Sequence, residues 1–106
     1  MSEMTVTVRT FEMDTDKAAA LKPLEEAAEV YGAWQDVDKQ IAFYRNLFPG
    51  FTKIDTDSSY WLKSRLADEL ADCITACCNL AARYGLDMDR AMERCEERNR
   101  ERGRYA

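Results

Sequence analysis

The chain has 106 residues, enough for one domain, and a formal net charge of −5 with no histidine. The lack of histidine excludes Ser–His–Asp catalysis, Cys–His catalysis and every metal site that uses a histidine ligand. The acidic balance argues against a general nucleic-acid binder, and no apolar run is long enough to cross a bilayer. We therefore expect a soluble, cytoplasmic protein with neither a nucleic-acid nor a membrane partner.

Residues 1–16 are predicted to form an N-terminal arm, followed by a helical domain over residues 17–106. Residues 4–10 alternate apolar and polar side chains as a strand does, and three interpretations stay open: an arm, an edge strand paired across a dimer, or a disordered segment. Either Asp14 or Asp16 can cap the first helix. Pro23 then lies in the first turn of that helix or kinks a longer one.

Apolar side chains that recur every three or four residues predict three helices. The first covers residues 24–46 and the second covers residues 60–84, with Gly85 suited to the left-handed position after a helix end. Asp87 is the expected N-cap of the third helix, which ends near Gly103.

Between the first two helices, the sequence Phe-Pro-Gly-Phe at residues 48–51 breaks the helical pattern, and residues 55–59 form a polar loop rich in N-cap residues. The predicted fold class is all-α, a helical bundle of about three main helices. So short a chain cannot cover an apolar stripe on each helix. We therefore expect a homodimer or homotetramer.

The four cysteines follow a C-x3-C-C-x16-C spacing over residues 73–95. Adjacent Cys77 and Cys78 point about 100° apart on a helix, so they do not easily face one metal. We interpret all four as small apolar helix residues in a reducing compartment, in preference to metal ligands or disulfides.

Four carboxylates interrupt the apolar rows of the first two helices. Glu26 shares its row with apolar residues four, seven and eleven positions further on, and Glu29 flanks that row. Glu69 and Asp72 occupy the corresponding row of the second helix. Acidic pairs at this spacing are common on solvated faces, but two pairs in register with apolar rows favour a divalent metal site. Mg²⁺, which prefers carboxylate oxygens, would relieve the cost of burying these charges.

The same residues carry a resemblance to a known family. The pattern E-E-x-x-E at residues 25–29 and the pattern E-x-x-D at residues 69–72 match, in order, the signature of the MazG-like nucleoside triphosphate pyrophosphohydrolases. Lys-Pro-Leu at residues 22–24 and the tail Arg-Asn-Arg-Glu-Arg-Gly at residues 98–103 are also similar to the family pattern. The resemblance covers roughly residues 17–105, although the spacing between the two acidic motifs is longer than is usual in this all-α superfamily.

The resemblance implies cleavage of a nucleoside triphosphate, with a dNTP expected, between the α and β phosphates to give the monophosphate and pyrophosphate. It also implies that Glu26, Glu29, Glu69 and Asp72 hold Mg²⁺, or Mn²⁺ in its place, with Glu25 as an extra ligand or a base that orients water. Small members of the family are dimers or tetramers, so the resemblance further implies that neighbouring copies complete four-helix bundles by oligomerisation. Two alternatives remain: a non-enzymatic acidic helical module that binds a partner, and the related phosphoribosyl-ATP pyrophosphatase.

Basic and aromatic side chains are the candidates for substrate binding. Lys63, Arg65, Arg98 and Arg102 are candidates to clamp phosphates, although Lys63 and Arg65 fit a solvated helix face equally well. Asn99 and Arg102 are the better candidates because they continue the apolar row of the third helix.

The two tryptophans are candidates to stack on a base. Trp34 lies in the middle of an apolar stripe, so packing in a core or interface is the favoured interpretation. Trp61 begins the second helix beside the polar loop and is the better stacking candidate.

Overall fold

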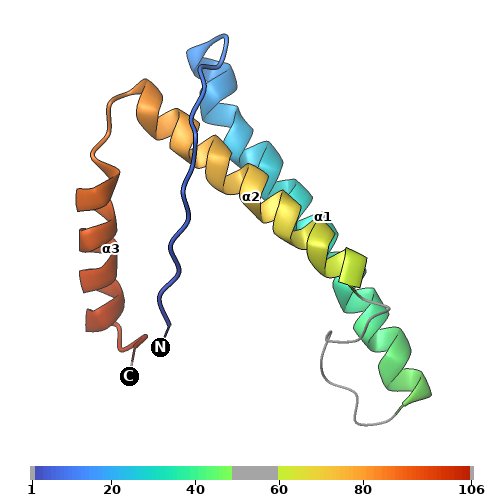
Figure 1. The fold of residues 1–106 in the computed structure, drawn as a ribbon. Coiled ribbons are helices and arrows are strands. Elements are labelled where there is room, and N and C mark those ends of the chain that lie inside the picture. Colours follow the sequence, from blue (N-terminus) through green and yellow to red (C-terminus); the bar gives the residue numbers. More distant parts are fainter. Residues whose placement is uncertain (1, 49–59, 106) are drawn as a thin grey trace.

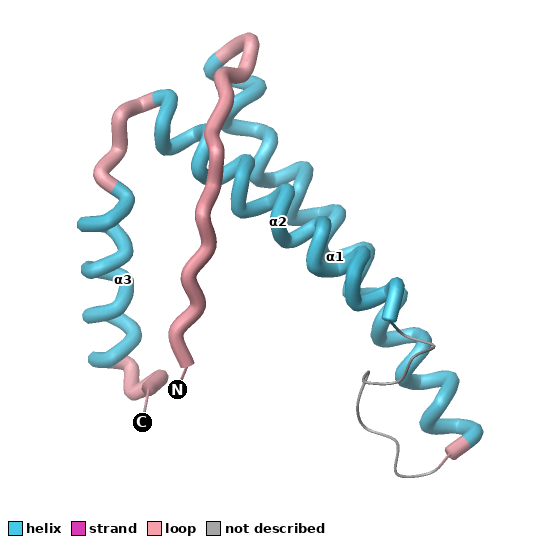
Figure 2. Tube along the Cα trace, viewed as in Figure 1, coloured by secondary structure: helices cyan, strands magenta, loops and turns pink. Residues whose placement is uncertain are grey.

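A computed structural model describes residues 2–48 and 60–105 of the chain. These residues form three helices, α1 (Asp16–Leu47), α2 (Tyr60–Arg83) and α3 (Met88–Glu101), and none of them lies in a strand, which confirms the all-α prediction (Figure 1). None of these helices is both long and apolar enough to cross a membrane. Residues 2–13 have no regular secondary structure and run as an extended segment (Figure 2).

The start of α1 differs from the prediction. Neither Asp14 nor Asp16 is the N-cap; Thr15 is, and its Oγ1 accepts a hydrogen bond of 3.0 Å from the backbone N–H of Ala18. Asp16 is instead the first helical residue, where its charge favours the positive end of the helix dipole. Pro23 lies inside α1, beyond its first turn, so the helix is the longer of the two alternatives.

The ends of α2 and α3 follow the expected capping signals. Gly85 has φ of +62°, and the backbone N–H of Leu86 donates to the carbonyl of Ala81 at 3.0 Å, as in a Schellman motif. Asp87 caps α3, since its Oδ1 accepts from the N–H of Arg90 at 3.1 Å. Both local predictions are confirmed, and α2 ends one residue before the predicted Tyr84.

The break after the first helix is described only at its beginning. Phe48 is the C-cap residue of α1, and its backbone N–H donates to the carbonyl of Tyr44 at 2.7 Å. The remainder of the predicted break and the polar loop at residues 55–59 lie outside the described residues.

α1 and α2 pack along each other as an antiparallel pair (Figure 1). Two ion pairs join them at separate levels: Arg83 Nε lies 2.5 Å from Asp16 Oδ1, and Arg65 donates to Asp36 closer to the other end. Small residues such as Ala19 and Ala33 on α1 and Ala76 on α2 are buried, which lets the helices approach closely. The register of the pair is therefore fixed by charge at two levels and by small side chains between them.

α3 stands apart from this pair and buries none of its residues (Figure 1). Its predicted apolar row is present, but Met88 and Met92 are exposed. The chain has a radius of gyration of 17.3 Å, whereas about 13 Å is typical of a compact domain of this length. A single chain thus leaves much of its apolar surface in water.

The cysteines lie on α2 and α3 and carry free thiols. Burial raises the pKa of the Cys77 thiol, and the neighbouring Cys73 and Cys78 raise it further. A thiol that keeps its proton is a poor nucleophile and a poor metal ligand.

Candidate metal centre

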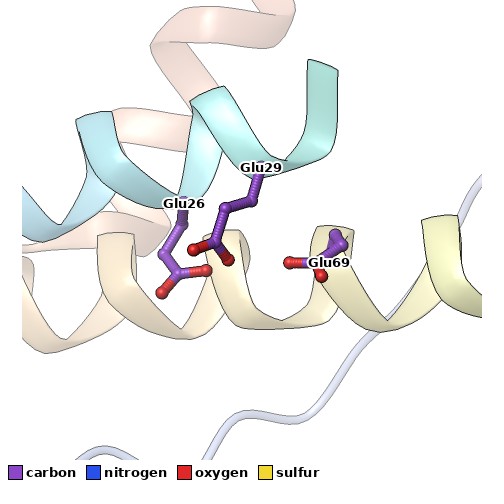
Figure 3. Close-up of side chains that lie close together, drawn as sticks. All are labelled: Glu26, Glu29 and Glu69. Carbon is purple, nitrogen blue, oxygen red and sulfur yellow. The ribbon is translucent and has the colours of Figure 1, made fainter. Parts of the chain in front are cut away.

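Three glutamates from two helices come together between α1 and α2. Glu26 and Glu29 extend from α1 and Glu69 extends from α2, and one carboxylate oxygen of each lies within 4.8 Å of the others (Figure 3). Glu26 and Glu29 are one helical turn apart, so their side chains leave the same side of α1. The antiparallel pairing of the helices places Glu69 opposite them, although 39 residues separate Glu69 from Glu29 along the chain.

The burial of these carboxylates increases from the rim of the site inward. Glu29 is exposed, Glu69 is half-buried, and Glu26 is only 7% exposed on the buried row that also holds Ala19, Ala33 and Val37. Glu26 Oε2 and Glu69 Oε2 are buried without a hydrogen-bond partner. A buried carboxylate oxygen without a partner costs free energy, and two such oxygens beside a third carboxylate form an arrangement that a cation would stabilise.

Lys22 partly neutralises the cluster from one side. Its Nζ lies 3.2 Å from Glu26 Oε1 and 3.7 Å from Glu25 Oε2, at the spacings of four and three residues that place side chains together on a helix. The hydrogen bond to Glu26, together with the charge of that carboxylate, raises the pKa of the Lys22 ammonium. Lys22 contacts Oε1 of Glu26, whereas Oε2 of the same carboxylate is buried and has no hydrogen-bond partner. A cation beside Oε2 would stabilise this second oxygen.

The residues present fit a hard divalent cation. Three carboxylates supply oxygen donors of the type that Mg²⁺ and Mn²⁺ prefer, and the unpartnered oxygens of Glu26 and Glu69 are available to such an ion. The sequence prediction named Glu26, Glu29, Glu69 and Asp72 as metal ligands, and the structure brings the first three of them together.

Asp72 and Glu25 are not part of the three-carboxylate cluster. Asp72 is exposed and lines a hollow together with Glu26, one turn of α2 away from Glu69. Glu25 has a side chain that is 60% exposed and pairs with Lys22. The structure therefore brings three of the five predicted acidic residues into one group and places the other two at its edge.

The predicted phosphate-binding residues of α2 lie on a different part of the helix pair. Arg65 is ion-paired with Asp36 of α1, and this contact lies about one turn of α2 from Glu69 and about two turns of α1 from Glu29. Lys63 lies on α2 two residues before Arg65 and is half-buried. Trp61 is exposed in the first turn of α2, and Trp34 is partly exposed and stacks on Tyr31 with ring centroids 5.6 Å apart.

The predicted substrate-binding residues of α3 are not brought to the cluster within one chain. Asn99 donates to Tyr105 Oη at 3.3 Å and accepts from Arg104 Nη1 at 3.2 Å, so it ties down the C-terminal turn. Asn99 also borders a hollow shared with the start of the chain rather than with α1. Arg98 and Arg102 lie in the last turn and at the C-cap of α3, where cations favour the negative end of the helix dipole.

Sequence reasoning missed two residues beside the site. Lys22 was noted only as part of a motif, although a lysine four residues before a glutamate predicts an ion pair on a helix. Asn79 is only 5% exposed on α2, and its Oδ1 accepts a 2.8 Å hydrogen bond from the backbone N–H of Phe11. A polar amide between apolar Ala76 and Leu80 was the available signal for Asn79.

Comparisons of the chain with protein-family models, with curated proteins and with solved structures found no match. The case for the site therefore rests on its own geometry.

Replacing Lys22 by Met is expected to tighten Mg²⁺ binding about two- to fivefold, because the ammonium competes with the metal for Glu26 and repels it. Isothermal titration calorimetry with Mg²⁺ alone measures this change, and Lys17→Met, an exposed lysine on the same helix, is the matched control. Weaker Mg²⁺ binding by the Lys22 variant, with the control unchanged, would show instead that Lys22 supports the metal-binding geometry.

Proposed function

We propose that the protein hydrolyses a nucleoside triphosphate between its α and β phosphates in a reaction that depends on Mg²⁺. The observation that carries the proposal is the convergence of Glu26, Glu29 and Glu69, with two of their oxygens buried and without partners. The resemblance of the acidic motifs at residues 25–29 and 69–72 to MazG-like pyrophosphohydrolases supplies the reaction class. Hydrolysis adds one water and gives the nucleoside monophosphate and pyrophosphate.

In this proposal Glu26, Glu29 and Glu69 would hold the cation, and the cation would supply positive charge to the phosphates and acidify water at the site. Asp72, one turn from Glu69 and beside Glu26 in the neighbouring hollow, is placed to accept a proton or a water contact at the edge of the site. Glu25 is placed further out, where its exposed carboxylate orients water that enters the site. Lys22 is the cation nearest to Glu26, and an arriving phosphate would give it a second anionic partner.

The test is a panel of the four common NTPs and the four dNTPs, incubated with the protein and Mg²⁺ or Mn²⁺, with separate detection of pyrophosphate and orthophosphate. We expect pyrophosphate as the primary product for at least one substrate, and loss of the activity in EDTA because the carboxylates alone offer no positive charge to the phosphates. Orthophosphate as the first product, or full activity in EDTA, would contradict the proposal. Phosphoribosyl-ATP is added to the panel, and cleavage of this substrate alone would identify the related phosphoribosyl-ATP pyrophosphatase activity. If no substrate is cleaved, the result would favour the non-enzymatic module that binds a partner.

The second part of the proposal concerns assembly. The chain exposes 8579 Å² of surface, whereas a compact protein of its mass exposes about 6000 Å². That excess is of the size that obligate homodimers bury between their subunits. The exposed apolar side chains on α1 and α3, among them Phe43, Leu47, Met88 and Met92, supply the surface that a second copy would cover.

Light scattering coupled to gel filtration is expected to give a mass of at least twice the 12.2 kDa of the chain at micromolar concentration. Met92→Glu is expected to shift the mass toward the monomer, because it places a charge in the exposed apolar row of α3. Arg94→Glu introduces the same side chain two residues away on another side of the helix, and it is expected to leave the mass unchanged. A monomeric mass for the wild type would rule out the assembly.

A further inference from the structure

The N-terminal segment, residues 2–14, is fixed to α2 by two side chains and is called the strap below. The backbone N–H of Phe11 donates to Asn79 Oδ1 at 2.8 Å, and Arg83 Nη1 donates to the carbonyl of Met13 at 2.6 Å. Arg83 also pairs through Nε with Asp16, the first residue of α1. Asn79 is almost completely buried and its bond to Phe11 is part-buried, so the strap has a defined position against α2 at residues 11–13.

A hollow of about 360 Å³ lies between the strap and the two helices. Phe11 and Met13 of the strap form one wall, and Lys22, Glu26 and Asp72 are among the residues on the side of the carboxylates. Glu26 therefore belongs both to the candidate metal centre and to this hollow. A ligand whose anionic end is held at the metal centre would extend its next part into the hollow.

The walls of the hollow suit a flat, largely apolar group joined to an anion. Phe11 remains 61% exposed although its backbone N–H is bound by Asn79, so an aromatic side chain lines the hollow that also holds Glu26 and Asp72. Aromatic rings held in this way bind nucleobases by stacking. The thioether of Met13 adapts its shape to different apolar partners.

We propose that the hollow between the strap and the α1–α2 pair binds the nucleoside part of a nucleotide, with Phe11 stacked on the base. This inference rests on the proposed function, because the metal centre is what holds the phosphates next to the hollow. Arg83 then acts as a positioning residue, since it fixes the strap through Met13 and Asp16 without lining the wall that the base contacts.

Two variants of the strap distinguish ligand binding in the hollow from ligand binding at the candidate metal centre. Full-length wild type, Phe11→Ala and Val6→Ala are titrated with each of the four deoxynucleoside monophosphates in Mg²⁺ and, separately, with pyrophosphate in Mg²⁺. Phe11→Ala is expected to lose about tenfold in affinity for the monophosphate that the wild type binds best, the effect of removing one stacking contact, while its affinity for pyrophosphate stays unchanged. Val6→Ala, an exposed apolar residue of the same strap, is the matched control and is expected to change neither affinity.

Two further variants test the nature of the contact. Phe11→Tyr keeps the aromatic ring and is expected to retain monophosphate affinity, whereas Phe11→Leu keeps bulk without the ring and is expected to behave like Phe11→Ala. Arg83→Gln is expected to show the same selective loss, because the strap is then held by Asn79 alone. Circular dichroism confirms that the helices of each variant are intact.

Equal monophosphate affinity in wild type and Phe11→Ala would overturn the inference, and so would parallel loss of monophosphate and pyrophosphate binding. If nucleotides bind in a way that depends on Phe11 but are not cleaved, the result would support nucleoside binding in the hollow and contradict the proposed hydrolysis. If nucleotides are cleaved with the same KM by wild type, Phe11→Ala and Phe11→Leu, the result would support the hydrolysis and contradict nucleoside binding in the hollow.

Discussion

Replacing Glu69 by Gln is expected to lower the rate of pyrophosphate release on the order of a hundredfold or more. The amide keeps the shape of the side chain but removes the negative charge that α2 contributes to the cluster with Glu26 and Glu29. The cation would then have only the two carboxylates of α1, one of which is exposed and the other shared with Lys22. The rate is measured from initial velocities of pyrophosphate formation at saturating Mg²⁺.

Asp68→Asn is the matched control for this variant. It removes the same charge from the adjacent position of α2, but Asp68 is exposed and points about 100° away around the helix. The control is expected to keep nearly the full rate, and both variants are expected to show the helical circular dichroism of the wild type. Equal rates for the two variants would show that the charge of Glu69 has no part in the reaction.

Mg²⁺ is expected to raise the melting temperature of the protein at pH 8 by about 10 °C or more when it is present at a hundredfold excess over its dissociation constant. In the metal-free protein, three carboxylate oxygens lie within 4.8 Å of one another, and two of the carboxylates have a buried oxygen with no partner. Their mutual repulsion and incomplete solvation destabilise the folded state, and a bound cation removes both effects.

The Glu69→Gln variant extends this experiment. Without Mg²⁺ at pH 8 it is expected to melt at or above the temperature of the wild type, since one repelling charge is gone, and the response to Mg²⁺ is expected to disappear. The melting temperatures are measured by differential scanning fluorimetry. A control with Na⁺ in place of Mg²⁺ at the same ionic strength distinguishes Mg²⁺ binding from general screening of the charges by salt.

Asp68→Asn is again the control, and it is expected to keep the full shift with Mg²⁺. Melting curves that superimpose with and without Mg²⁺ at pH 8 would mean that the three glutamates are an ordinary acidic patch. Such a result would leave the reaction class without its structural support.

Part of the candidate metal centre could be predicted from the sequence, because the positions of its residues follow helical periodicity. Glu26 lies on the same row as Ala33 and Val37, and a residue on the buried row of an amphipathic helix faces the neighbouring helix whatever its charge. The flanking position predicted for Glu29 likewise agrees with its exposure at the rim of the site.

The membership of the cluster was not predictable in full. Asp72 lies one turn along α2 from Glu69 on the same row, so the sequence alone does not show which of the two acids lies opposite Glu26 and Glu29. Only the level of α2 that lies opposite Glu26 and Glu29 contributes an oxygen to the cluster, and that level is the one of Glu69. The alignment of the two helices is set by contacts far along the chain, such as that of Arg65 with Asp36.

The sequence by itself determined the three helices, the caps at Asp87 and Gly85, and the row on which Glu26 lies, because each depends on residues within a few positions of one another. Only the tertiary structure decided where the strap lies, since the N–H of Phe11 donates to a side chain of α2 and the carbonyl of Met13 accepts from another, both about 70 residues away. It also decided that Arg98, Asn99 and Arg102 stay apart from the carboxylates within one chain, because α3 packs on neither of the helices that carry them. Local periodicity fixes which face of a helix is apolar, whereas the partner of that face is fixed by packing between segments that are distant in the sequence.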